Sequence, residues 1–313
     1  MMNRKIAFIF AGQGAQKVGM GKELTEHFEV ADAIFTQATE ALCIDMHKMV
    51  FESDEETLQI TENTQPAILT TSVACLAVLK EKGIQPDIVA GLSLGEYTAH
   101  VAAGSIQFED AVKLVRKRGN FMQEAVPAGV GTMAAIIGLA QQEVIEVCNQ
   151  VSQAGFVEPA NFNCPGQVVI AGEVGAVEKA CAIAKDKGAK RAMILPVSAP
   201  FHCSMLKPAG KKLENALEEV MVQKMQIPVI ANVNATYIKN EADIKPLLVK
   251  QVSSSVRWED SVRKMITDGV DTFIEIGPGK ILSGFVKKID RNVTILNVED
   301  MASLKNTLEK LEV

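Results

Sequence analysis

The stretch Asp87-Ile88-Val89-Ala90-Gly91-Leu92-Ser93-Leu94-Gly95-Glu96 joins a short apolar run to a segment of helical character. This order predicts a buried strand, a tight turn and a helix. Neighbouring backbone leaves no room for side chains at positions 91 and 95 in such a turn, so the two glycines have a steric reason. The pattern is typical of a nucleophile elbow, which lifts a serine hydroxyl clear of a sheet. A chance serine in a glycine-bearing turn is the alternative.

A second glycine-rich stretch, Gly12-Gln13-Gly14, follows the apolar run Ile6 to Phe10, which predicts a first buried strand. The stretch is not a dinucleotide fingerprint, because Lys17 stands where the third glycine is needed, and it is not a P-loop. If Ser93 is a nucleophile, the N–H of Leu94 at the start of the helix points where an oxyanion would form. Exposed N–H groups of the first loop could complete that oxyanion hole.

Length and composition indicate a globular chain of 313 residues with one large domain and a smaller insert. A net charge of -6 argues against a nucleic-acid surface. No apolar run approaches the ~20 residues of a membrane span, and the run after Arg4-Lys5 is too short for a signal peptide. We therefore expect a cytoplasmic protein that binds neither nucleic acid nor membrane.

Six cysteines show no C-x-x-C pair and no regular spacing. Neither a zinc site nor a disulfide framework is therefore predicted, and the cysteines are interpreted as reduced, mostly buried thiols.

The order of predicted elements changes after Val126-Pro127. Residues 127–197 follow the order β-α-β-β-α-β, which is typical of a ferredoxin-like unit. We predict that this segment is an inserted small domain, and that residues 1–126 and 198–313 form a large hydrolase-like α/β domain with a parallel sheet flanked by helices. The strands expected in the large domain are 6–10, 88–90, 227–232, 270–276 and 294–298. A helix over 67–82 is expected to begin with Thr64-Gln65-Pro66 as its cap and first turn.

Arg118 lies on the apolar stripe of a predicted helix over 108–125, together with Val115 and Met122. Arg116 and Lys117 point away from that stripe. An inward arginine requires an anionic partner.

A serine needs a base to be nucleophilic at neutral pH, and imidazole is the usual one. His27 and His47 lie on polar-faced helices, and His100 points along its own helix. His202 lies in a loop where the chain re-enters the large domain, and it is the candidate base. Its neighbour Cys203 is a weak alternative nucleophile, because adjacent loop residues rarely face one another.

A hydrolase of this topology would supply a carboxylate between the serine and the histidine. Asp110 opens a helix and Asp186 closes one, and neither follows a strand of the main sheet. A Ser-His-Asp triad is therefore not favoured, and a backbone carbonyl or a side-chain amide could orient the ring instead.

Taken together, these motifs resemble the malonyl-CoA:acyl carrier protein transacylase family, over essentially the whole chain. The stretches that carry the resemblance are Gly12-Gln13-Gly14-Ala15-Gln16, Asn63-Thr64-Gln65-Pro66-Ala67, Gly91-Leu92-Ser93-Leu94-Gly95-Glu96-Tyr97, Val115-Arg116-Lys117-Arg118-Gly119, Asn161-Phe162-Asn163-Cys164-Pro165-Gly166-Gln167, Pro200-Phe201-His202 and Glu275-Ile276-Gly277-Pro278-Gly279.

The resemblance implies a ping-pong transfer of a malonyl group from malonyl-CoA to the phosphopantetheine thiol of acyl carrier protein. Ser93 resembles the acylated nucleophile and His202 the base. Gln13 and Leu94 resemble the two oxyanion donors. No cofactor and no metal are implied, and a monomer is expected.

Other positions carry specificity in the family. Arg118 resembles the residue that pairs with the malonyl carboxylate, and Gln251 resembles the residue whose backbone carbonyl holds the histidine. Asn161 resembles a cleft-lining residue, although Asn163 is close by. Phe201 resembles the residue found in malonyl-selective members, where a smaller residue accompanies methylmalonyl use.

The chain departs from the family pattern at Ala11, Ala15 and Leu92, where many relatives carry proline, serine and histidine. None of these positions holds a reacting group. Three alternatives stay open: a serine thioesterase or other hydrolase, a trans-acting acyltransferase of polyketide synthesis, and a catalytically silent binding module. Four basic groups are candidates for docking an acidic carrier protein, namely Arg116-Lys117, Lys187-Lys190-Arg191, Lys211-Lys212 and Lys287-Lys288-Arg291.

Overall fold

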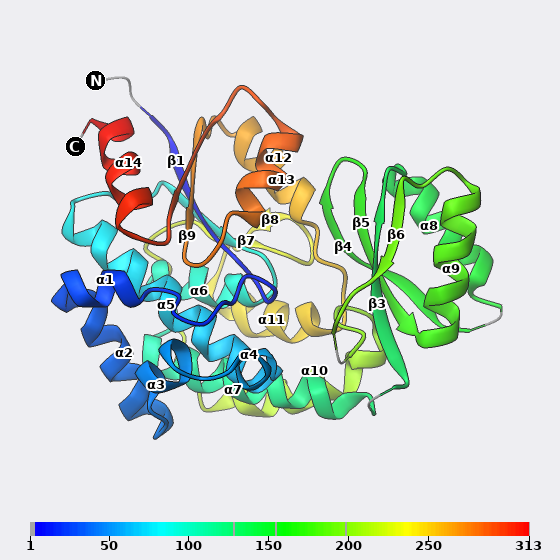
Figure 1. The fold of residues 1–313 in the computed structure, drawn as a ribbon, viewed down its shortest axis with the longest axis horizontal. Coiled ribbons are helices and arrows are strands. Elements are labelled where there is room, and N and C mark those ends of the chain that lie inside the picture. The colour runs from blue at the N-terminus through cyan, green and yellow to red at the C-terminus, as the bar shows by residue number, and fades with distance from the viewer. Residues whose placement is uncertain (1–3, 128, 154, 198, 313) are drawn as a thin grey trace.

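The computed structural model describes residues 4–127, 129–153, 155–197 and 199–312. A parallel sheet with the strand order β10-β9-β1-β2 forms the centre of its larger part (Figure 1). Its strands are β1 (Ile6–Phe10), β2 (Ile88–Gly91), β9 (Thr272–Ile276) and β10 (Thr294–Val298). The helices of this part are α1 (Lys22–His27), α2 (Glu29–Leu42), α3 (Met46–Phe51), α4 (Glu55–Gln59), α5 (Thr61–Glu81), α6 (Leu94–Ala102), α7 (Phe108–Ala125), α10 (Lys207–Glu218), α11 (Ile244–Val252), α12 (Trp258–Thr267), α13 (Ile281–Ile289) and α14 (Met301–Leu311).

Alternating side chains of β1 belong to two separate cores. Phe8 and Phe10 pack into a large cluster with residues of α2, α5, α6 and α7. Ala7 and Ile9 pack into a second cluster with residues of α12 and α13. Since successive side chains of a strand point to opposite faces, helices must cover both faces of this sheet. The predicted α/β fold with a parallel, helix-flanked sheet is confirmed.

A second, antiparallel sheet has the order β4-β5-β3-β6, and α8 and α9 pack against it. Its elements are β3 (Gly131–Ile137), α8 (Gln141–Val151), β4 (Val157–Cys164), β5 (Gln167–Glu173), α9 (Val174–Asp186) and β6 (Arg191–Ile194). In chain order this is β-α-β-β-α-β, as predicted for a ferredoxin-like unit. The domain boundaries at residues 127 and 197 stay a prediction, and Ser198 lies outside the described residues.

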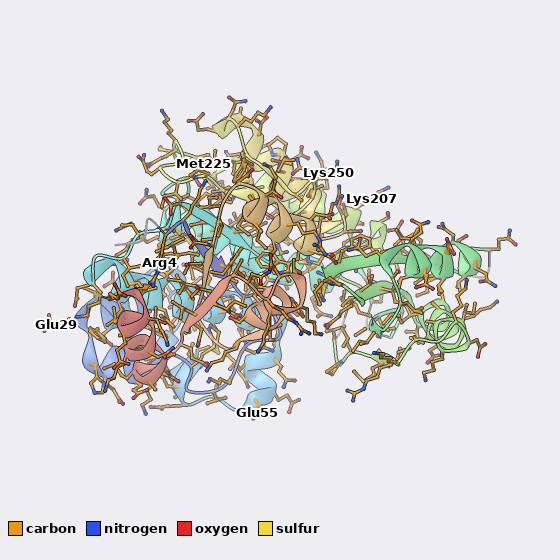
Figure 2. The ribbon with its side chains drawn as sticks, turned by 90° about the horizontal axis from the view of Figure 1, so that it is seen from above. Arg4, Glu29, Glu55, Lys207, Met225 and Lys250 are labelled. Atoms are coloured by element: carbon orange, nitrogen blue, oxygen red, sulfur yellow. The ribbon has the colours of Figure 1, made fainter. Side chains whose placement is uncertain are left out.

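Figure 2, seen from above, shows this second unit projecting from the body of the molecule, with Lys207 and Lys250 near the junction. Lys207 begins α10 and Lys250 belongs to the last turn of α11, two helices that pack against each other. The short turns η1 (Ser204–Leu206) and η2 (Glu241–Asp243) precede these two helices. None of the helices in the described ranges is both long and apolar enough to cross a membrane.

Two predicted elements differ from the structure. Helix α5 begins at Thr61, so Pro66 lies inside it, and the Thr64 hydroxyl donates to the carbonyls of Leu58 and Ile60 instead of capping the helix. The strand predicted over 227–232 is reduced to β7 (Ile230–Ala231), which pairs with β8 (Thr236–Tyr237). Pro228 has no N–H to donate to a sheet ladder, and the backbone of this run joins β2 through an isolated bridge between Val229 and Val89 and not as a continuous strand.

Candidate active site

Ser93 lies in the turn between β2 and α6 with φ 55° and ψ -105°, a backbone conformation that is strained for a residue with a side chain. A Cβ at Gly91 would collide with the backbone of Gly95, and a Cβ at Gly95 would collide with the carbonyl of Phe10. The elbow therefore needs glycine at both positions. Asn232 holds the turn, because its Oδ1 accepts from the Ser93 N–H at 2.7 Å and its Nδ2 donates to the Gly91 carbonyl at 2.7 Å.

His202 faces the serine from the loop after β6. Its Nε2 lies 2.6 Å from Ser93 Oγ, and its Nδ1 lies 2.9 Å from the backbone carbonyl of Gln251 in the last turn of α11. A carbonyl can only accept, so Nδ1 carries the proton and Nε2 presents a lone pair to the serine hydroxyl. Burial lowers the pKa of His202 to about 4; the nearby Arg118 cation also lowers it, and the hydrogen bond to Gln251 opposes the shift. The ring is therefore a neutral base at neutral pH.

Arg118 of α7 is 1% exposed and points into the site. Its Nη2 donates to Ser93 Oγ at 3.1 Å and to Gln251 Oε1 at 3.0 Å, and its Nη1 donates to Gln65 Oε1 at 2.8 Å. The ring of Tyr97 lies 5.2 Å from the guanidinium carbon. Every one of these partners is neutral.

No carboxylate of the described residues lies within ion-pair distance of Arg118, whereas its neighbours on the outer face of α7 both have acid partners. Arg116 lies 3.8 Å from Glu62, and Lys117 lies 3.0 Å from Glu219. A guanidinium cannot be deprotonated in a protein, so Arg118 is a buried cation without an ion-pair partner. It is prepared to receive an anion beside the serine hydroxyl.

Gln13 and Leu94, the predicted oxyanion donors, both lie near Ser93: Gln13 lines the same cavity as the serine, and Leu94 follows the serine in the chain. Leu94 is the first residue of α6, and Gln13 follows Gly12, whose position would place a Cβ 2.5 Å from the Leu92 carbonyl. Within the described part of the chain, neither the Gln13 nor the Leu94 N–H donates to another residue. Both are thus available as oxyanion donors.

A cavity of about 890 Å³ opens over Ser93 and His202. Gln13, Arg118, Asn161 and Phe201 also line it, and the family resemblance predicts Asn161 and Phe201 as cleft-lining residues. Its lining further includes residues from α4, α5, α7 and α13, from the loops after β1 and β2 of the parallel sheet, and from strands β3, β4 and β5 of the antiparallel sheet. A cavity of this size lies in the range that is typical of small-molecule sites.

Three further residues belong to the site that the sequence reasoning did not single out: Gln65, Asn232 and Glu96. Gln65 and Glu96 are polar side chains in helices that are otherwise almost entirely buried, and Asn232 ends an apolar run. A polar residue at such a position is the signal that could have found them. That signal does not indicate which residues these three side chains bond to.

The remaining histidines and Cys203 do not reach the serine. His100 is buried and its Nδ1 bonds to Ser105 Oγ, while His47 pairs with Asp32 at 2.8 Å. Burial raises the pKa of Cys203 to about 12, which suppresses its thiolate.

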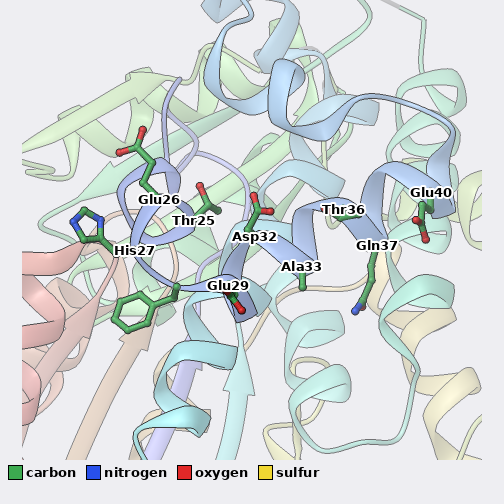
Figure 3. A pocket seen from close by; sticks show the side chains of 10 residues that line it. Thr25, Glu26, His27, Glu29, Asp32, Ala33, Thr36, Gln37 and Glu40 are labelled. Carbon is green, nitrogen blue, oxygen red and sulfur yellow. The ribbon is translucent and has the colours of Figure 1, made fainter.

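A second hollow, of about 680 Å³, lies along α1 and α2 and includes His27 (Figure 3). It shares no lining residue with the cavity over Ser93. All six cysteines are free thiols and five of them are buried, and the described residues form no cluster of metal-ligating side chains.

Comparison with known proteins identifies the family of this chain. The model of the acyl transferase domain family matches residues 7–305. A relative from Bacillus subtilis named malonyl CoA-acyl carrier protein transacylase is 50% identical over 309 residues, which cover 98% of each protein. The crystal structure of the protein of that name from Clostridium perfringens is 52% identical, with a TM-score of 0.96 over 98% of this chain and 97% of that one.

A malonyl-transacylase solved in complex with a type II PKS acyl-carrier protein is 44% identical, with a TM-score of 0.95 over 98% of this chain and 99% of that one. At these sequence identities over nearly the full length, the similarity is one of family and not only of fold. The chain belongs to the acyl transferase domain family and, within it, to the malonyl CoA-acyl carrier protein transacylases.

Proposed function

We propose that this chain transfers a malonyl group from malonyl-CoA to the phosphopantetheine thiol of acyl carrier protein, through a malonyl ester on Ser93, and so supplies fatty acid elongation. The observation that carries the proposal is the buried Arg118, whose Nη2 lies 3.1 Å from the nucleophile and which has only neutral partners. An acyl group that ends in a carboxylate supplies the missing anion, and acetyl leaves the cation unpaired.

In the first half-reaction, the Ser93 hydroxyl gives its proton to Nε2 of His202 while Oγ attacks the thioester carbonyl carbon. The N–H groups of Gln13 and Leu94 hold the oxyanion of the tetrahedral intermediate. The carbon–sulfur bond then breaks, the coenzyme A sulfur takes the proton from His202, and malonyl remains as an ester on Ser93.

In the second half-reaction, the phosphopantetheine thiol gives its proton to His202 and its sulfur attacks the ester carbonyl. The bond to Ser93 Oγ breaks, and the serine oxygen recovers the proton. A single base thus serves both directions. The carboxylate of the acyl group, held by Arg118, keeps the ester in one orientation between the two steps.

The same proposal accounts for partners and cofactors. Coenzyme A enters as substrate and phosphopantetheine belongs to the carrier protein, so the chain itself needs no cofactor. Ser93, His202 and Arg118 come from one chain, so a monomer suffices. Six free thiols are typical of a reducing compartment, which favours the cytoplasm.

For carrier protein docking we favour the basic group Lys287-Lys288-Arg291, whose two lysines lie in the last turn of α13. Ile281, Leu282 and Phe285 of this helix line the cavity, and Lys288 donates to Gln167, another lining residue. Among the other candidates, Lys117, Lys211 and Lys212 are already paired with glutamates.

The test is intact mass spectrometry after incubation with malonyl-CoA or acetyl-CoA. We expect one malonyl adduct that is absent in Ser93→Ala, and little or no acetyl adduct. Adding carrier protein should move the adduct to it. Release of free malonate faster than transfer to the carrier thiol would instead identify a hydrolase, and absence of any adduct would identify a silent binding module.

A further inference from the structure

Glu96 of α6 is a fully buried acid next to the catalytic cluster, and it does not line the cavity. Its Oε2 accepts from the Gln251 side-chain Nε2 at 2.7 Å and from the backbone N–H of Asn232 at 3.1 Å. Its Oε1 has no hydrogen-bond partner in the described part of the structure. Burying a carboxylate is costly, so its position here needs an explanation.

The side-chain amide of Gln251 is held from both ends. Its Oε1 accepts from Arg118 Nη2 at 3.0 Å, and its Nε2 donates to Glu96 and, at 2.9 Å, to the backbone carbonyl of Ser93. An amide has one accepting and one donating end, and the acid can only accept when ionised. Together with the Ser93 carbonyl, Glu96 holds the NH₂ end of this amide, so the oxygen of Gln251 faces the arginine.

The amide also links two buried ionisable groups, Arg118 and Glu96. Arg118 has no carboxylate at ion-pair distance among the described residues, and Glu96 lies one amide away from it. Burial raises the pKa of Glu96 to about 7, while the hydrogen bonds from Gln251 and Asn232 and the Arg118 cation act in the opposite direction. The arrangement leaves the Arg118 guanidinium oriented and still free to pair with a substrate anion.

We propose that Glu96 is a positioning residue for acyl-group selection: by fixing the Gln251 amide, it fixes the orientation in which Arg118 receives the carboxylate of the acyl group. Glu96 itself touches no substrate. The inference rests on the proposed malonyl transfer and adds a residue that determines its selectivity.

The test compares Glu96→Leu, which removes the acceptor, with Glu96→Gln, which keeps an acceptor oxygen without the charge. Acylation of Ser93 by malonyl-CoA and by acetyl-CoA gives two kcat/KM values and their ratio. In Glu96→Leu we expect this ratio to fall about tenfold, the effect of losing one hydrogen bond to a charged group. In Glu96→Gln we expect it to stay within about threefold.

Glu259→Leu is the matched control. Glu259 is another buried glutamate, 6% exposed, but its partners are Gln141 and Arg263, away from the site. This variant should lose stability without changing the ratio. In an Arg118→Ala background, Glu96→Leu should not change the ratio further.

Equal loss of malonyl and acetyl transfer in Glu96→Leu would overturn the proposal, because it would indicate a structural role only. A loss in Glu96→Gln as large as in Glu96→Leu would also overturn it. If Glu96→Leu does not fold, Gln251→Leu replaces it: this variant removes the linking amide, keeps the backbone carbonyl that holds His202, and should lower the ratio similarly. Failure of the wild-type chain to form a malonyl ester would refute the proposed function before any variant is compared.

Discussion

At the scale of single residues, the chemistry depends on three side chains with different roles: the nucleophile Ser93, the base His202 and the cation Arg118. Ser93 and His202 can serve any acyl transfer or hydrolysis. Arg118 separates the possibilities, because a buried cation with only neutral partners favours an anionic acyl group over a neutral one.

The first prediction concerns this arginine. Arg118→Ala should lower kcat/KM for malonyl-CoA by about two to three orders of magnitude, since a buried ion pair with the substrate is lost, and should change that for acetyl-CoA far less. Rates of Ser93 acylation by each thioester measure the ratio. Arg116→Ala on the outer face of the same helix is the control and should leave the ratio unchanged; an unchanged ratio in Arg118→Ala would show that the arginine does not select the acyl group.

The second prediction concerns His202. Since burial lowers its pKa from 6.5 to about 4, the neutral base is fully present above pH 6 and is lost only as the pH falls through about 4. The rate of Ser93 acylation measured in single turnovers should therefore stay nearly constant from pH 8 to pH 5.5. An ordinary histidine would halve the rate near pH 6.5, and a midpoint there would contradict the buried, neutral state of the ring.

At the scale of elements, the elbow between β2 and α6 matters for packing as well as for catalysis. The turn sits directly against the end of β1, so that a Cβ at Gly95 would collide with the carbonyl of Phe10. The strained conformation of Ser93 survives because the hydrogen bonds of Asn232 hold the turn on both sides.

The third prediction compares two glycines at the same helix position. Gly95 is the second residue of α6 and Gly175 is the second residue of α9, where an added Cβ meets no atom within 4 Å. Gly95→Ala should lower the free energy of unfolding by about 2–4 kcal/mol and abolish acylation, because backbone must move. Gly175→Ala should raise it by up to about 1 kcal/mol. Denaturant titration measures both, and a Gly95→Ala variant as stable as wild type would refute the steric account of the elbow.

At the scale of the whole molecule, the second sheet is attached to the segments that hold His202. Glu158 of β4 accepts from the backbone N–H of Ser204 at 2.9 Å and from its hydroxyl at 3.0 Å, just beyond the histidine. The same strand bonds to Val256 through the Ala160 carbonyl and the Phe162 N–H, five residues after Gln251. The unit formed by β3 to β6 thus holds the segments around His202 in place and also lines the cavity.

The fourth prediction follows from this attachment. Glu158→Ala should lower kcat for acylation about tenfold, because the loop that carries His202 loses two hydrogen bonds to a charged group. The ratio of malonyl to acetyl transfer should stay within about twofold, since Arg118 is untouched. Steady-state kinetics with both thioesters measure this. A changed ratio with an unchanged kcat would mean that Glu158 acts on the acyl pocket and not on the base.

Short-range patterns in the sequence predicted much of this molecule. The period of two in strands, the period of 3.6 in helices and the glycines around Ser93 act over a few residues, so they indicated the parallel sheet, the β-α-β-β-α-β unit and the inward side of Arg118. They were less accurate in two places: the run that contains Pro228 forms only the two-residue strand β7, and the Thr64 hydroxyl donates to the carbonyls of Leu58 and Ile60 instead of capping a helix.

The sequence by itself determined that a serine sits in an elbow and that an arginine faces the interior, because both follow from spacing and from the steric needs of a turn. Only the tertiary structure decided which groups meet there. The partners Ser93 and His202 are 109 positions apart, and Glu96 and Gln251 are 155 apart. Hydrogen bonds over such separations depend on how the strands are ordered and how the loops close, and no local periodicity records that. The elbow can therefore be predicted from the sequence, whereas the hydrogen bonds that link Glu96 through Gln251 to Arg118 are seen only in the tertiary structure.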